Sequence, residues 1–343
     1  MFDILSDVDI KVSFPLQQEV INALETVRIS SPSSIPVTYV WIDPSDGKIL
    51  SEKREFTSKP KRLEDYPARH KECVILQPVA VYEDPFERRD NGKLVLCETL
   101  DLDMKPTATN HRHHCLQTMQ TAECQAADPK FSMIQHYFAI DKNTKRPLGW
   151  PVNSDPIPDA TRLQYSPYGW AASDMIMDAS HYWREARLRV RRHRHTEYAG
   201  FWWFQVANCD KGMLEIADNL WMARYILQRT ADIHEMLISF APFAPKPAFG
   251  GPRAGLEVWF QSREIPNEIE NLKVSQRMKK GENIVCDVGK IEAVAENPFF
   301  GLKNYIKDTR ASSDSDPYQL TLKLINESGI LKDQSVFLDT STL

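Results

Sequence analysis

The stretch FSMIQHYFAIDKNTKRPLGWP, residues 131–151, predicts a strand that ends in a polar turn and a loop closed by proline. Side chains alternate between the two faces of a strand, so Ser132, Ile134 and His136 share one face. A histidine beside an isoleucine on one strand face can be a metal ligand, a core histidine or the remnant of a former site. The first question about function is therefore whether His136 is a metal ligand, a core residue or such a remnant.

The first part of the chain predicts a helix and then a small β-rich unit. Residues 16–30 carry apolar side chains at helical spacing, and the SSPSSIP segment after them breaks that pattern. Residues 37–43 and 48–56, joined by Pro-Ser-Asp-Gly, predict a β-hairpin. Two further strands are predicted, at 73–86 and 93–101. The unit is expected to end near Lys105.

The rest of the chain predicts a larger region in which strands and helices alternate. Residues 110–125 predict a helix that Asn110 caps at its N-terminus. Residues 201–209 predict a strand, and residues 219–237 an amphipathic helix. Together with the strand at 131–140, this pattern indicates an α+β fold.

Composition narrows the class of protein. A chain of 343 residues with 42% hydrophobic content can bury the cores of two domains. It has no apolar run of about 18 residues, and its first residues are acidic where a signal peptide would be basic, so we expect a soluble, cytoplasmic protein. The six cysteines form no CxxC pair, which favours free thiols. A net charge of −5 argues against nucleic-acid or membrane partners.

Several segments together resemble one known family. VTYVWID with DGKIL, LQPVAVYEDPF, GKLVLCETLD, FSMIQHYFAID with RPLGWP, WWFQVANCDKG, DNLWMARYILQR and SDSDPYQLTLKLI follow one another in the order found in eukaryotic-type glutamine synthetases. The resemblance covers residues 35–331. It implies an N-terminal β-grasp domain and a larger glutamine synthetase catalytic-type domain of twisted antiparallel sheet and helices. In that family, subunits form rings with each active site between neighbouring subunits.

The resemblance also implies domain boundaries. Residues 1–34 would form an N-terminal helical segment, residues 35–105 the β-grasp domain, and residues 106–343 the catalytic-like domain. The last of these is shortened between 262 and 304, and it lacks the family's Arg-Leu-Thr-Gly and His-Glu-Thr signatures there. The segment 63–78 replaces the Asp-Gly-Ser-Ser loop with which the family completes a neighbour's site.

The family's chemistry sets what its site must contain. The side-chain carboxylate of glutamate takes the γ-phosphoryl group of ATP, and ammonia then displaces phosphate. Mg²⁺ or Mn²⁺ ions neutralise the transferring group. Such hard cations need oxygen ligands, which the family supplies as carboxylates together with one histidine.

Most of the implied metal ligands are replaced in this chain. Where the family has Glu-Gln-Glu, residues 134–136 read Ile134, Gln135, His136. The family's Gln-Trp-Glu-Phe-Gln corresponds to residues 201–205, so Trp203 replaces a carboxylate. Packed apolar groups in place of clustered charges often stabilise a fold.

The remaining site positions have changed as well. The family's upstream glutamate falls on Thr196, although a slip of one residue would place Glu197 there. The family's metal-binding histidine corresponds to Glu257, and a carboxylate near the nucleotide corresponds to Lys307. His136, Glu197 and Glu257 could form a weak divalent or transition-metal site, but a core histidine is the commoner case.

Two basic stretches have simpler readings. The histidines of NHRHHC (110–115) would point in divergent directions on a helix, which favours a solvated helix start over a ligand set. REARLRVRRHRH (184–195) lacks an aromatic platform for nucleic acid, so a solvated or subunit-facing edge is favoured.

Three functions remain open at this point. The first is a pseudoenzyme of the glutamine synthetase family with a structural or regulatory role, in a homo-oligomer or with an active synthetase, and without a cofactor. The second is an active ATP-dependent glutamate–ammonia ligase with unusual ligands, using ATP with Mg²⁺ or Mn²⁺. The third is a non-catalytic module that binds a nucleotide or another small molecule.

Overall fold

The computed structural model describes twelve parts of the chain. They are residues 34–58, 60–71, 73–87, 92–150, 172–196, 199–207, 212–240, 254–262, 291–296, 303–308, 316–327 and 330–331. The helix predicted at 16–30, and with it the segment 1–34 up to residue 33, lies outside the described residues. So do Glu197 and most of the stretch between 262 and 304.

A five-stranded sheet forms the N-terminal part, in the order β2-β1-β5-β4-β3. Its strands are β1 (Ile35–Ile42), β2 (Ile49–Phe56), β3 (Arg69–Lys71), β4 (Val74–Glu83) and β5 (Lys93–Leu100). The predicted hairpin is confirmed as the antiparallel pair β1·β2. Its turn is held by Asp43, whose Oδ1 accepts from the Ser45 amide at 2.8 Å, and by Gly47 at φ 70°. β1 and β5 run parallel at the centre of the sheet.

The two faces of this small sheet belong to different cores. Val37, Tyr39 and Trp41 pack with Tyr66 in a local cluster on the outer face. Val40, between them in sequence, points the other way and joins the main core of the molecule. Alternation along β1 therefore makes the small sheet both a unit with its own core and one wall of the main core.

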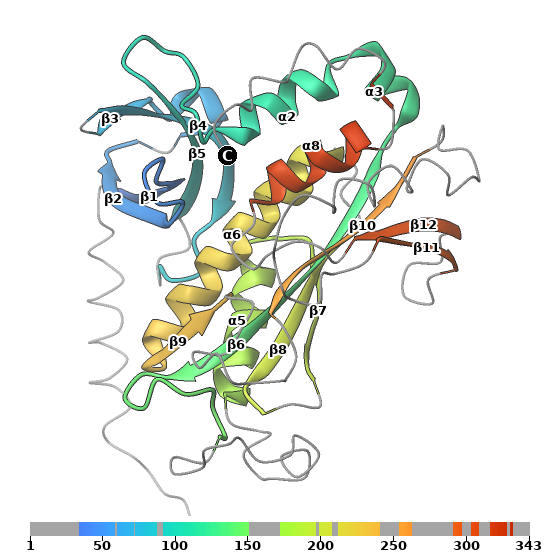
Figure 1. Cartoon of the computed structure of the whole chain (residues 1–343). Helices are drawn as coiled ribbons and strands as arrows, with labels where there is room; N and C mark the ends of the chain where they lie inside the picture. The colour runs from blue at the N-terminus through green and yellow to red at the C-terminus, as the bar shows by residue number, and fades with distance from the viewer. Residues whose placement is uncertain are drawn as a thin grey trace, which may run out of the picture.

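The larger sheet is antiparallel, with the order β11-β12-β10-β6-β8-β7 and β9 paired to the far end of β6. Its strands are β6 (Lys130–Asp141), β7 (Val190–His195), β8 (Phe201–Val206), β9 (Met236–Ser239), β10 (Gly255–Gln261), β11 (Ile291–Glu296) and β12 (Lys303–Asp308). Five α-helices and one 3₁₀ turn, η1 (Leu63–Asp65), accompany the two sheets in the described residues. The α-helices are α2 (His111–Met119), α3 (Ala122–Ala127), α5 (Ser173–Glu185), α6 (Gly212–Ile233) and α8 (Pro317–Glu327). Figure 1 shows α6 and α8 between the small sheet and the large one. This is the expected α+β fold.

Two helix predictions were wrong in their bounds. The helix predicted for 219–237 ends at Ile233, because Glu235 takes the left-handed conformation (φ 54°) and the chain then pairs with β6 as β9. The helix predicted for 110–125 is two helices. Thr121 breaks it with an extended backbone and caps α3 by accepting from the Cys124 amide at 3.3 Å. The cap at Asn110 is confirmed, since its side chain accepts from the His113 amide.

Strand β6 is fixed against α6 by a buried polar contact. Arg224 of α6 is only 2% exposed, and its Nε donates to Oε1 of Gln135 at 2.9 Å. Its guanidinium also lies 4.8 Å from the ring centre of Trp221 and 5.2 Å from that of Phe240. Because Gln135 faces the helix, Ile134 and His136 on either side of it face the opposite way.

A second buried contact joins three helices. Arg112 of α2 makes two hydrogen bonds to Asp218 of α6, at 2.9 and 3.0 Å, and the hydroxyl of Tyr318 in α8 donates to the same carboxylate at 2.5 Å. Burial, and after it the negative charge of Asp218, raises the pKa of the Tyr318 hydroxyl, which therefore stays neutral.

None of the described helices combines the length and apolar character that a membrane span requires.

Changing Asp218→Leu is expected to lower the free energy of unfolding by about 3 kcal/mol or more, because the Arg112 guanidinium remains buried without its counter-charge. The double variant Arg112→Met with Asp218→Leu should recover at least about 1 kcal/mol of that loss. Urea unfolding measures both. A double variant that is less stable than Asp218→Leu alone would contradict a net cost of the unpaired charge.

The half-buried His193 makes stability depend on pH. Its Nε2 lies 2.6 Å from the Tyr137 hydroxyl and its Nδ1 lies 2.9 Å from Oγ of Ser180, while burial lowers the pKa of the imidazole to about 3. The unfolded histidine takes a proton near pH 6.5, whereas the folded one stays neutral. Stability should therefore be complete above about pH 6.5 and fall by up to about 1.4 kcal/mol per pH unit towards pH 3.

Urea unfolding at a series of pH values measures this dependence. His193→Gln should flatten the slope between about pH 6 and 4, because glutamine can keep the hydrogen bonds without titrating. The exposed His181, which pairs with Glu185 on the surface of α5, provides the control. His181→Gln should keep the wild-type slope, and an equally steep slope in His193→Gln would exclude His193 as its source.

Candidate functional site

The face of the large sheet turned away from α6 carries most of the positions at which the family resemblance implies site residues. In the pairing of β6 with its neighbours, Ile134 lies opposite Glu257 on β10 and Gln205 on β8. His136 lies opposite Gly255 on β10 and Trp203 on β8. Four of the six proposed former-site positions, 134, 136, 203 and 257, are therefore close neighbours on one surface.

The other two positions lie further along the same strands. Thr196 follows β7 directly, and both its amide and its hydroxyl donate to the carbonyl of Phe201, at 3.1 and 3.0 Å. Lys307 of β12 is the register partner of Trp259 in β10. Register thus brings Thr196 to the β8 side of the surface and the backbone of Lys307 to the β10 side.

His136 has an aromatic environment. Its imidazole stacks on Phe201 with ring centres 5.6 Å apart and an angle of 19° between the planes. Phe201 in turn packs on Phe138, with ring centres 4.6 Å apart, and both belong to a small apolar cluster with Ile140 and Ala254. This end of the surface is lined by rings and aliphatic groups, a poor environment for a doubly charged ion.

Glu257 is the one carboxylate on this face among the described side chains of β6, β8 and β10. Its Oε1 accepts a hydrogen bond from the indole nitrogen of Trp259 at 2.5 Å. The family resemblance did not single out Trp259. Its spacing from Glu257 could have done so, because residues two apart on a strand share a face. One carboxylate oxygen is therefore already engaged by a neutral donor.

Uncharged polar groups lie on the β8 side of Ile134. The amide of Gln205, only 2% exposed, donates to Oγ of Ser132 at 3.2 Å, and that hydroxyl donates to the carbonyl of Val206 at 3.1 Å. These groups satisfy one another within the sheet. They add no negative charge to the face.

The described residues do not fit a divalent metal centre. They contain no group of three or more His, Cys, Asp or Glu side chains placed to hold a metal ion. Of the candidate ligands His136, Glu197 and Glu257, the first and third lie on adjacent strands and the second lies outside the described residues. Mg²⁺ requires near-octahedral oxygen coordination, to which the described face offers one carboxylate and one imidazole.

The two basic stretches take ordinary places in the fold. The NHRHHC segment begins α2, where Nδ1 of His113 lies 4.0 Å from a carboxylate oxygen of Glu98 and burial lowers the pKa of His114. Residues 184–195 run from the end of α5 into β7, the last strand in the described order of the large sheet. In this second stretch, the side chain of His193 points into the core, where it contacts Tyr137 and Trp183.

The sequence is similar to several known proteins that share one name. No family model matches the chain. It is 31% identical over 368 aligned positions to a protein of Caenorhabditis elegans named probable glutamine synthetase, covering 92% of this chain and 98% of that one. It is 29% identical to the glutamine synthetase of Panulirus argus, covering 84% and 91% of the two chains. It is also 29% identical to glutamine synthetase 2 cytoplasmic of Drosophila melanogaster, covering 91% and 92%.

These relatives match along nearly their whole length, and the elements that carry the resemblance lie in the two sheets and in α6 and α8. The chain belongs to the glutamine synthetase family, as a divergent member.

Proposed function

We propose that this protein is a pseudoenzyme of the glutamine synthetase family, with a structural or regulatory role in place of glutamine synthesis. The observation that carries the proposal is the described face of the large sheet, where Ile134, His136 and Trp203 share one face with a single described carboxylate, Glu257. Phosphoryl transfer from ATP relies on divalent ions to neutralise the transferring group. A face with this composition removes the main electrostatic stabilisation of that reaction.

The same replacements are favourable for the fold. Several carboxylates in one cleft repel one another unless a metal fills it, whereas packed apolar groups need no ion. Phe201 stacks on His136 and packs in turn on Phe138, and the indole of Trp259 hydrogen-bonds to the remaining carboxylate. The surface is thus stable as it stands, without a cation.

We extend the proposal to the domains. Residues 35–105 are assigned as a β-grasp domain and 106–343 as the catalytic-like domain, shortened between 262 and 304. The parallel central pair β1·β5, flanked by antiparallel strands, supports the first assignment. The antiparallel large sheet packed on α6 supports the second.

The assay of γ-glutamyl hydroxamate formation with Mg²⁺ or Mn²⁺ separates this function from an active ligase with unusual ligands. The purified full-length protein is expected to give no product above a heat-inactivated sample, because its described face supplies too few oxygen ligands. An active glutamine synthetase serves as the positive control. Product that disappears in the Glu257→Gln variant would overturn the proposal and establish the ligase.

Restoring carboxylates tests the physical argument directly. The variant carrying Ile134→Glu and His136→Glu should lower the free energy of unfolding by about 2 kcal/mol in the presence of a chelator, since the new charges face Glu257. Mn²⁺ should reverse most of that loss by binding the carboxylates. Thermal unfolding with and without Mn²⁺ gives both quantities.

The matched control replaces the same two residues by glutamine, which has nearly the size of glutamate without its charge. This control and the wild-type protein should show no stabilisation by Mn²⁺. If wild type gains as much thermal stability from Mn²⁺ as the double glutamate variant, the face binds metal already and the argument fails.

We propose further that the protein acts as an oligomer, either with itself or with an active glutamine synthetase, in the cytoplasm. A relative from Drosophila melanogaster that is named cytoplasmic supports this compartment, whereas another from the same organism is named mitochondrial. Native mass and co-purification test the assembly, and a strict monomer without a synthetase partner would contradict it.

The remaining alternative is a module that binds a small molecule without turnover. Calorimetry with ATP, ADP and glutamate tests it, and saturable heats of binding without turnover would favour it.

A further inference from the structure

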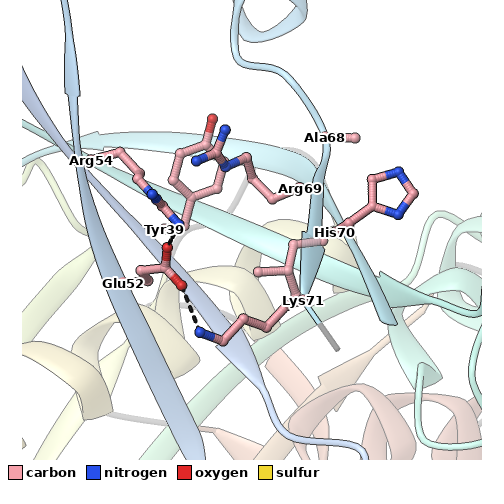
Figure 2. Close-up of a pocket in the computed structure, with 8 residues that line it drawn as sticks. Tyr39, Glu52, Arg54, Ala68, Arg69, His70 and Lys71 are labelled. Carbon is pink, nitrogen blue, oxygen red and sulfur yellow. Dashed lines mark hydrogen bonds and ion pairs between the residues drawn. The ribbon is translucent and has the colours of Figure 1, made fainter. Parts of the chain in front are cut away.

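A polar hollow lies on the outer face of the small sheet, away from the positions discussed so far. Its volume is about 340 Å³, which is within the range of small-molecule sites. Strands β1 to β4 and the segment before β3 line it with Tyr39, Glu52, Arg54, Ala68, Arg69, His70, Lys71 and Leu76 (Figure 2). Five of its eight lining residues come from the segment 63–78, where the resemblance implies that a family loop is replaced.

Strand pairing brings its charged residues together. In the β1·β2 hairpin, Tyr39 lies opposite Glu52, and Arg54 is two residues further along β2 on the same side. Arg69 and Lys71 are likewise two residues apart on β3, which pairs with β4. The Tyr39 hydroxyl donates to the carbonyl of Pro67 at 3.1 Å and so anchors the segment that leads into β3.

The hollow carries an excess of positive charge. Glu52 is its only acidic lining residue, and its carboxylate pairs with Nζ of Lys71 at 2.8 Å and with the guanidinium of Arg54. Arg69 is half-buried, with its guanidinium carbon 5.9 Å from the ring centre of Tyr39. Within the described residues, no ion pair joins Arg69 to a carboxylate. Three cations therefore line the hollow together with one anion; Figure 2 shows Arg54 and Lys71 joined to Glu52, and Arg69 beside the ring of Tyr39.

The floor of the hollow is a neutral aromatic ring. Burial raises the pKa of the Tyr39 phenol to about 12, so the ring adds no negative charge at neutral pH. One ion pair uses few of the donors of Arg54 or Lys71, because a guanidinium has five N–H groups and an ammonium three. Arg54, Arg69 and Lys71 therefore line one hollow with more donors than the Glu52 carboxylate can use, beside an uncharged ring.

We propose that this hollow binds the phosphate group of a small molecule. A phosphate monoester carries nearly two negative charges at neutral pH and three terminal oxygens, which match the excess charge and the separate donors of Arg54, Arg69 and Lys71. The fork of an arginine fits two phosphate oxygens, whereas a lysine acts as a point charge. Glu52 offsets part of the attraction, and its removal strengthens binding.

The site is independent of the proposed function. Its residues belong to the small sheet, whereas positions 134, 136, 203 and 257 belong to the large one. An active ligase could carry this hollow as well as a pseudoenzyme could. A failure of one proposal therefore leaves the other standing.

Calorimetric titration of the full-length protein with inorganic phosphate, at fixed ionic strength, tests the proposal. Wild type is expected to bind phosphate saturably in the millimolar range or tighter. Arg69→Gln should weaken binding at least about tenfold, because it removes the charge and the fork together. Glu52→Gln should tighten binding several-fold, since it removes the one repelling charge, and a gain of affinity is not an effect of misfolding.

The control is Lys61→Gln, which makes the same change in net charge as Arg69→Gln at an exposed position outside the lining. It should bind phosphate as wild type does. Equal affinity in wild type and Arg69→Gln, or no saturable heat in wild type, would overturn the proposal. Acetate titrated in parallel should bind much more weakly, and acetate binding as tight as phosphate binding would exclude a phosphate-selective site.

Discussion

The contact between Arg224 and Gln135 determines how the rest of the large sheet is presented. A buried guanidinium can be tolerated only where acceptors and aromatic faces surround it, and here Gln135, Trp221 and Phe240 supply them. Because side chains alternate with a period of two, fixing Gln135 towards α6 fixes Ile134 and His136 on the opposite face. A slip of one residue would exchange the two sets, so this contact, together with strand pairing and the core side chains Met133 and Tyr137, fixes which surface is presented.

In the proposed function, the opposite face belongs to a fold that persists after the residues of a charged site are replaced. Neighbouring strands still bring positions 134, 136, 203 and 257 together, because register depends on backbone pairing and on the apolar helix-facing side. Aromatic and amide groups there satisfy one another without a cation. The elements that organise this face, β6, β8 and α6, each carry one of the segments that resemble glutamine synthetases.

Local sequence patterns predict much of this architecture, whereas its details depend on contacts between segments that are far apart in the sequence. The hairpin at 37–56 and the Asn110 cap follow from turn and cap chemistry. The end of α6 did not, since pairing of β9 with β6 and the left-handed Glu235 override a helical pattern that continues to residue 237. Alternation predicted that Ile134 and His136 share a face. The bond from Trp259 to Glu257 and the hollow around Arg69 required the register of separate strands, which spacing alone does not give.

The shared core beneath the small sheet ties the two halves of the molecule energetically. Val40, Leu94 and Leu96 are completely enclosed among side chains of the larger half, and the ring of Phe86 packs on Tyr182 of α5 at 5.1 Å. Separating the sheets would expose all of these groups to water at once. We therefore expect the two halves to unfold as one cooperative unit. A chain cut between them near residue 106 should give fragments whose exposed apolar surfaces promote aggregation, in place of two independently folded domains.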